Sequence, residues 1–210
     1  MPPHIDAVLF DYGQVLSQPP DPAAWDRLIL QTGLDHDTLH REYWLYRHAY
    51  DEGAYTGVTY WQQIAADTNR TYIPAQIESF LDTDFDLWCR PNTPMQDWAK
   101  KLQAASTRTG ILSNIGDAMT ARFLARLPFF TGFYHCTWSY ALHLAKPDPA
   151  IYRAAIAGLE TAPERILFID DIERNIGPAR DLGLTAIQYH PGDHPRFLEE
   201  MNALGLAHLL

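Results

Sequence analysis

Acidic side chains follow two apolar runs of this 210-residue chain, and they are its most reactive feature. The first run, Ile5–Phe10, is followed by Asp11. The second run, Ile166–Ile169, is followed by Asp170 and Asp171. Buried parallel strands have such continuous apolar sequences, and the ligands of a parallel sheet lie beyond the carboxyl ends of its strands. The pattern therefore predicts three carboxylates at one edge of a sheet.

Three clustered carboxylates favour metal-assisted chemistry on phosphorus. Crowded carboxylates raise one another's pKa unless a cation neutralises them. Mg²⁺ prefers oxygen ligands and commonly takes one or two carboxylates together with a substrate phosphate. Asp11 is the candidate nucleophile, because a carboxylate can attack phosphorus, form an aspartyl-phosphate and release it to water. The sequence thus predicts an Mg²⁺-dependent phosphoryl-transfer enzyme.

Polar residues at two other points could hold the phosphoryl group. Ser113 and Asn114 follow the apolar run Thr109–Leu112, where a hydroxyl and main-chain N–H groups would form a phosphate cradle. Lys146 precedes Pro147, which stiffens the backbone, and its ammonium would offset the carboxylate charges. Taken singly, these residues fit a helix cap and a solvated lysine equally well, and Asp11 alone fits a capped turn.

Two further residues are expected beside the acids. Gly13 allows a sharp turn of the backbone and would bring its carbonyl within reach of a cation. Asn175, four positions after Asp171, can hydrogen-bond a ligand carboxylate or metal-bound water.

The elements that must position these residues form an α/β pattern. Helical segments lie between the later four of five predicted strands, as βαβ units require. Thr93 with Gln96 is predicted to cap one helix, and Asp148 another. We expect a Rossmann-like parallel sheet with helices on both faces. The strands are predicted at Ile5–Phe10, Thr109–Leu112, Phe133–Thr137, Ile166–Ile169 and Thr185–Tyr189.

A long segment without strands separates the first two strands. It is predicted to contain four helices, although an ordinary crossover needs only one. We therefore expect residues 1–16 and 92–210 to form the catalytic core and residues 17–91 an inserted α-helical cap over the site. The four helices are predicted at Pro22–Gln31, Thr38–Tyr50, Thr59–Thr68 and Pro74–Trp88.

Composition narrows the class of protein. The net charge of −10 and the lack of a Lys/Arg cluster argue against a nucleic-acid surface. Cys89 and Cys136 are isolated, which suits a reducing compartment. The first residues do not have the pattern of a secretory signal, and no apolar run is long enough to span a membrane. We expect a cytoplasmic protein, monomeric or homodimeric, that acts on a small phosphorylated metabolite.

Taken in order, these motifs resemble those of the haloacid dehalogenase-like hydrolase superfamily, over nearly the whole chain. The matching segments are Phe10–Leu16, Leu112–Asn114, Lys146–Asp148 and Asp170–Asn175. The helical insertion is similar to that superfamily's small cap. The resemblance implies that Mg²⁺ is held by Asp11, Asp171 and the Gly13 carbonyl. It also implies phosphoryl contacts from Ser113, Asn114 and Lys146, with Asp170 and Asn175 supporting the metal.

The chain departs from the superfamily at Gly13, where most of its phosphatases carry an acid that protonates the leaving group. Asp11–Val15 is closer to a bacterial Asp-x-Gly-x-Val subgroup that includes sugar-phosphate phosphatases. We therefore expect good leaving groups, such as anomeric sugar phosphates or acyl phosphates. His143 stands where relatives usually carry glycine. The cap residues proposed to contact substrate are Arg41, Tyr43, Arg47, His48 and Trp88.

Two other functions stay open. One is a 2-haloacid dehalogenase, which uses the same nucleophile on carbon without a metal, although Asp170 and Asp171 would repel its carboxylate substrate. The other is a catalytically silent protein that binds a phosphorylated metabolite, suggested by the missing acid at Gly13.

Overall fold

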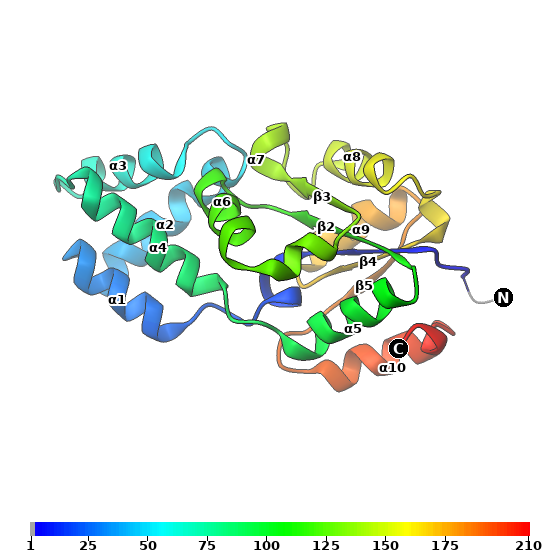
Figure 1. Cartoon of the computed structure of the whole chain (residues 1–210). Helices are drawn as coiled ribbons and strands as arrows, with labels where there is room; N and C mark the ends of the chain where they lie inside the picture. The colour runs from blue at the N-terminus through cyan, green and yellow to red at the C-terminus, as the bar shows by residue number, and fades with distance from the viewer. Residues whose placement is uncertain (1–2) are drawn as a thin grey trace.

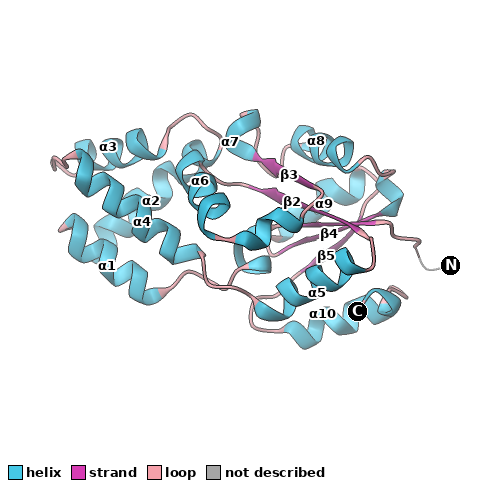
Figure 2. Ribbon diagram, in the orientation of Figure 1, coloured by secondary structure: helices cyan, strands magenta, loops and turns pink. Residues whose placement is uncertain are grey.

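The computed structural model describes residues 3–210 and contains a parallel five-stranded sheet with helices around it (Figures 1 and 2). The strand order is β3-β2-β1-β4-β5, and every neighbouring pair is parallel. The predicted α/β class with a Rossmann-like sheet is confirmed. The strands are β1 (Ala7–Phe10), β2 (Arg108–Ser113), β3 (His135–Trp138), β4 (Ile166–Asp170) and β5 (Thr185–Gln188).

The register of the central strands determines where the site forms. Phe10 of β1 lies beside Ile111 of β2 on one side and Ile169 of β4 on the other. The carboxyl ends of the three strands are therefore nearly level. Asp11, the first residue after β1, and Asp170, the last residue of β4, emerge side by side as the sequence predicted.

Each face of the sheet has its own apolar core because side chains alternate along a strand. Val8 and Phe10 pack on the face covered by α5 (Thr93–Ala104) and α10 (His194–Ala203). Ala7 and Leu9 pack on the opposite face, under α8 (Pro149–Leu159) and α9 (Glu173–Asp181). Both faces are thus covered, which is why the strand sequences are apolar throughout.

A separate group of helices, the helical unit, lies between β1 and α5 in the sequence and to one side of the sheet (Figure 1). It has its own aromatic core, which includes Tyr43, Tyr60 and Trp61. An isolated antiparallel bridge between Ser17 and Pro91 joins the two connecting segments. The division of the chain at residues 17 and 91 into core and cap stays a prediction. The unit consists of α1 (Pro22–Thr32), α2 (His36–Asp51), α3 (Gly57–Asp67) and α4 (Pro74–Trp88).

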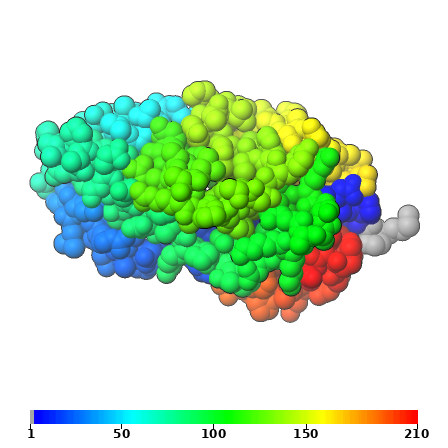
Figure 3. Space-filling model, in the orientation of Figure 1, coloured from blue at the N-terminus to red at the C-terminus, as the bar shows by residue number. Residues whose placement is uncertain are grey.

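The helical unit is held against the sheet domain chiefly through α6 (Asp117–Arg126) and α7 (Ser139–Leu142). Arg122 pairs with Glu78 at 2.6 Å and Asp82 at 2.8 Å. The Tyr50 ring fills the space beside Gly116, where an added Cβ would lie 2.1 Å from it. Figure 3 shows the surface of α6 continuous with that of α3 and α4. These contacts fix the end of α2 above the carboxyl edge of the sheet.

Most helix ends agree with the sequence pattern, with one correction. Asp148 caps α8 by accepting a hydrogen bond from the Ala150 N–H at 2.8 Å, as predicted. The predicted cap of α5 is wrong: Asn92, not Thr93, occupies the N-cap, and Gln96 donates to the Leu16 carbonyl instead of closing a capping box.

The remaining elements are short helical turns, and none of the helices in residues 3–210 is both long and apolar enough to cross a membrane. The turns are η1 (Tyr12–Leu16), η2 (Pro128–Gly132), η3 (Pro163–Arg165) and η4 (Ala207–Leu209).

Candidate active site

The turn after β1 orients Asp11. Its Oδ1 accepts the N–H of Tyr12 at 2.7 Å, and the chain then enters a single wide turn, η1. Gly13 has φ −60° and ψ 127°, a conformation open to any residue, so the turn after Asp11 does not depend on the conformational freedom of glycine. The residue in the left-handed region is Gln14, with φ 58°. The Gln14 Nε2 donates to Asp171 Oδ2 at 2.8 Å and joins the two loops.

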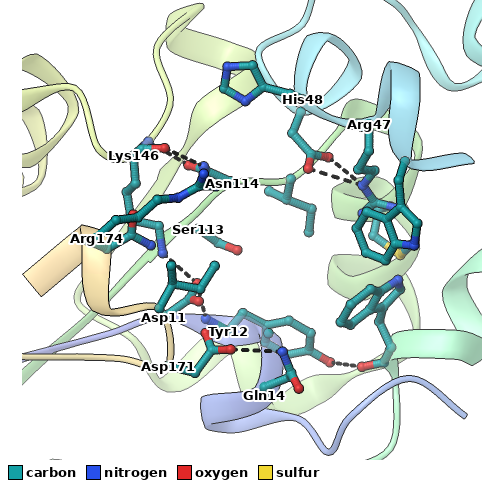
Figure 4. A pocket seen from close by; sticks show the side chains of 18 of the residues that line it. Asp11, Tyr12, Gln14, Arg47, His48, Ser113, Asn114, Lys146, Asp171 and Arg174 are labelled. Carbon is teal, nitrogen blue, oxygen red and sulfur yellow. Dashed lines mark hydrogen bonds and ion pairs between the residues drawn. The ribbon is translucent and has the colours of Figure 1, made fainter. Parts of the chain in front are cut away.

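The three predicted acids meet in one cluster. One oxygen from each of Asp11, Asp170 and Asp171 lies within 4.8 Å of the others. Lys146 lies among them, with its Nζ 2.8 Å from Asp11 Oδ1 (Figure 4). The same Nζ lies 2.6 Å from Asp170 Oδ2. The lysine side chain is 2% exposed. A solvated surface lysine, the alternative considered for this residue, is therefore excluded.

Burial and repulsion shift the pKa values of the cluster. Burial raises the pKa of Asp11 to about 7, with Lys146 acting against this shift and Asp170 and Asp171 adding to it. Burial, and then Asp170, raise the pKa of Asp171 to about 6. For Lys146, burial lowers the pKa, but the carboxylates of Asp11 and Asp170 outweigh it and the net shift is upward. One ammonium thus faces three carboxylates, which leaves two negative charges unbalanced when all are ionised.

The hydrogen bonds distinguish the two neighbouring acids. Both oxygens of Asp170 are engaged, because Oδ1 accepts from Ile172 N and Asn175 Nδ2 and Oδ2 contacts Lys146. By contrast, Asp11 Oδ2 and Asp171 Oδ1 make no hydrogen bond within residues 3–210, and the buried Asn175 Oδ1 also has no partner there. These unengaged oxygens are ligands of the kind that a divalent cation binds. The residues present therefore fit a magnesium ion.

Ser113 and Asn114 lie on the same cavity wall as Lys146 (Figure 4). The Asn114 side chain accepts from Lys146 N at 2.8 Å and donates to the Lys146 carbonyl at 2.9 Å. The Asn114 side-chain amide therefore positions Lys146. Only the main-chain N–H of Asn114 remains for the predicted contact with substrate. The Ser113 hydroxyl has no hydrogen bond to another described residue. It stays a candidate to contact the phosphoryl group.

The helical unit forms the opposite wall of a cavity of about 340 Å³. Of the five cap residues considered from the sequence, Arg47, His48 and Trp88 line this cavity. Tyr43 is buried inside the helical unit, and Arg41 is exposed and pairs with Glu42.

Other residues near the site are placed differently from expectation. His143 does not line the cavity, and its φ of 53° explains why glycine suits that position. Sequence reasoning missed Gln14, Trp44 and Arg174, all of which line the cavity. Gln14 and Arg174 lie within the motifs Phe10–Leu16 and Asp170–Asn175, so their positions could have indicated that they lie near the site. Trp44 carried no signal beyond its aromatic character.

Comparisons with known proteins identify the family of the chain and match its fold. Residues 5–183 match the family model of the haloacid dehalogenase-like hydrolases. An HAD family enzyme of Bacteroides thetaiotaomicron, crystallised with magnesium and inorganic phosphate, superposes with a TM-score of 0.75 at 22% identity, covering 90% of this chain and 95% of that one. The L-2-haloacid dehalogenase of Xanthobacter autotrophicus superposes with a TM-score of 0.67 at 16% identity, covering 95% and 83%. These structural likenesses show the fold.

Curated relatives match over a part of their length. The bifunctional epoxide hydrolase 2 of Sus scrofa is 31% identical over 123 residues, which are 55% of this chain and 22% of that protein. The chain spans about a third or less of the length of the first curated relatives that it matches.

Proposed function

The chain belongs to the haloacid dehalogenase-like hydrolases, and on that premise we propose that it is an Mg²⁺-dependent phosphatase of a small phosphorylated metabolite. The observation that carries the proposal is the cluster of Asp11, Asp170 and Asp171 around a single buried lysine, with oxygens left unengaged. The Bacteroides enzyme, which was crystallised with magnesium and phosphate, supports it.

In this mechanism one carboxylate oxygen of Asp11 attacks phosphorus. A bond forms between phosphorus and Asp11 while the bond to the leaving oxygen breaks, and water later cleaves the aspartyl-phosphate. Lys146 holds Asp11 in place through Oδ1 and stabilises negative charge on the phosphoryl oxygens, with Ser113 and the Asn114 N–H beside it.

Asp11, Asp171 and the Gly13 carbonyl are the residues that would hold Mg²⁺. The engaged Asp170 and Asn175 would support them by orienting Lys146 and the loop after β4. When bound, the ion supplies positive charge that offsets the carboxylates and the phosphoryl group. In the same proposal, residues 17–91 are the cap that covers the core of residues 1–16 and 92–210. That the protein works in the cytoplasm, as a monomer or homodimer, stays a prediction.

A screen of phosphorylated metabolites, with Mg²⁺ or with a chelator, tests the function. We expect phosphate release that requires Mg²⁺, and faster turnover of glucose 1-phosphate than of glucose 6-phosphate, because no acid side chain stands at Gly13. Sugar phosphates are the substrates that the Asp-x-Gly-x-Val pattern suggests. Absence of phosphate release from every ester would favour the silent binding protein.

The dehalogenase is the competing enzyme, and the fold alone accommodates it. Three carboxylates against one ammonium would repel a haloacid's carboxylate, which favours the phosphatase. Chloride release from 2-chloropropionate that survives complete chelation would reverse the ranking.

We expect Mg²⁺ to stabilise the protein much more at pH 8 than at pH 5.5. The folded-state pKa values of Asp11 and Asp171, about 7 and about 6, lie above the ordinary 3.8. Without metal, the stability that these protons contribute is therefore fully present below about pH 4 and is lost as the pH rises through 6 and 7. Mg²⁺ needs the ionised carboxylates, so its affinity rises over the same range.

Thermal unfolding with and without Mg²⁺ at the two pH values measures this effect. Mg²⁺ at a hundred times its Kd would add about 2.7 kcal/mol to the free energy of unfolding at pH 8. Asp171→Asn is the control and should abolish the Mg²⁺ response. An equal response of the unchanged protein at both pH values would contradict the assignment of these ligands.

A further inference from the structure

The cavity is lined by large apolar side chains, several of them aromatic, as well as by charged and polar groups. Arg47 and His48 of the helical unit lie across the cavity from Lys146 and Asn114 (Figure 4). Beside these charged and polar groups, large apolar side chains of both the helical unit and the sheet domain line the cavity. They are Tyr12, Trp44, Trp88, Ile115, Met119 and Phe123. A leaving group attached to a phosphoryl group at Asp11 would extend into this space.

Trp88 is a fixed part of this wall. Its indole Nε1 donates to the Tyr43 hydroxyl at 3.2 Å, and its carbonyl accepts from the Tyr12 hydroxyl at 3.0 Å. The Arg47 guanidinium lies 5.8 Å from its ring centre. Such contacts hold an aromatic ring in one orientation. Trp88 therefore offers a preformed flat surface to a ligand.

Trp44 extends the same surface to the mouth of the cavity. Its ring centre lies 6.4 Å from that of Trp88, with the two planes perpendicular. Trp44 is 45% exposed although it lines the cavity. An exposed indole at the mouth of a cavity is available for contact with a ligand ring. Such a contact removes apolar surface from water and therefore favours binding.

Two of the polar side chains on this side, Arg47 and Tyr12, are engaged with other residues. Arg47 Nε contacts both oxygens of Asp51, at 2.9 and 3.1 Å. The Tyr12 hydroxyl is taken by the Trp88 carbonyl. The His48 side chain is 65% exposed and lies across the cavity from Asp11 (Figure 4). On this side a leaving group would meet His48 as an open polar side chain, and the exposed Arg174 is a further one on the side of Lys146.

Building on the proposed phosphatase function, we propose that the preferred substrate is an aryl phosphate monoester, with its ring against Trp44 and Trp88. Attack by Asp11 forms the bond to phosphorus as the aryl oxygen leaves with the bonding electron pair. The resulting phenolate takes its proton from water. A phenol has a pKa of about 10, as tyrosine does, so it departs without an acid at Gly13.

Binding of two phosphonates that cannot be hydrolysed tests the ring site apart from reactivity. We expect phenylphosphonate to bind the Mg²⁺-loaded protein at least about tenfold more tightly than methylphosphonate, measured by calorimetry. Trp44→Ala should weaken phenylphosphonate about three- to tenfold and leave methylphosphonate unchanged. Leu45→Ala is the matched control, because Leu45 is 61% exposed on the same helix and does not line the cavity.

Equal binding of the two phosphonates, or an equal effect of Trp44→Ala on both, would overturn the ring site. Turnover separates this failure from failure of the phosphatase proposal. Phosphate release with a higher kcat/KM for glucose 1-phosphate than for phenyl phosphate would overturn the aryl substrate alone. Absence of release from every ester of the screen, phenyl phosphate included, with Mg²⁺ present would overturn both proposals.

Gly13→Asp should let the protein hydrolyse esters with poor leaving groups. The Gly13 backbone suits any residue, and the nearest atom to an added Cβ is a Trp88 ring carbon at 3.9 Å. The unchanged protein should turn over phenyl phosphate much faster than cyclohexyl phosphate. We expect the ratio of these two rates to fall at least about tenfold in the variant, because a positioned acid raises the rate with a poor leaving group by roughly 10²–10⁴-fold. Gly13→Asn has the same size without the acid. The same ratio in both variants would contradict the need for a leaving group that departs unprotonated.

Discussion

Asp11→Asn should abolish phosphate release, by on the order of 10⁴-fold or more, since loss of a nucleophile removes the covalent step. The amide keeps the size of the side chain but cannot attack phosphorus. It also removes a buried carboxylate whose pKa is raised to about 7, and Lys146 keeps Asp170 as a partner. We therefore expect the free energy of unfolding to change by only about 1–2 kcal/mol.

Steady-state phosphate release and thermal unfolding of the same preparation measure the two effects. Asp6→Asn is a matched control, because it makes the same change just before the other end of β1, where Asp6 pairs with Arg165. That variant should keep its turnover. Undiminished activity of Asp11→Asn would remove Asp11 from the mechanism and with it the aspartyl-phosphate.

Strand ends were the most predictable part of this site. A parallel strand that is buried on both faces needs apolar residues throughout, so the first acid after it marks the carboxyl edge of the sheet. Asp11 and Asp170 follow this rule, and the register of β1 with β4 makes them neighbours. The helix Pro74–Trp88 was predicted to the residue, because proline begins it and apolar residues recur along it.

Tertiary hydrogen bonds explain what the sequence could not give. Asn92 displaces Thr93 as the N-cap of α5 because the Asn92 amide donates to the Val15 carbonyl and the Tyr189 hydroxyl. Those partners are 77 and 97 residues away, so no local pattern reports them. Asn114 is similar: its type suggested a phosphate ligand, but its side chain is used by the Lys146 backbone.

The backbone at Gly13 shows a different limit. Glycine suggests a special conformation, yet here the special conformation belongs to Gln14 and the glycine φ is ordinary. Because Gly13 has no side chain, the space next to the Trp88 ring stays open. Residue type alone did not distinguish space from flexibility, and the backbone conformation was needed to choose between them.

Lys146→Met should reduce both turnover and stability, because one ammonium serves two carboxylates. Its Nζ contacts Asp11 and Asp170 at 2.8 and 2.6 Å, and its side chain is 2% exposed. Removing one partner of a buried ion pair costs about 3–5 kcal/mol. Loss of a positioned charge beside the phosphoryl group costs roughly 10²–10³-fold in kcat. We expect effects of these sizes at pH 8.

The loss of stability in Lys146→Met should shrink at pH 5.5. Lys146 lowers the pKa of Asp11, so its removal takes that pKa further above about 7, and the folded variant holds a proton that the unfolded chain releases. Its stability relative to the unchanged protein therefore falls as the pH rises. Lys100→Met, at an exposed lysine of α5, is the matched control and should stay within about 0.5 kcal/mol at both pH values. An equal deficit at the two pH values would mean that Lys146 acts by packing and not by balancing the charge on which the metal site depends.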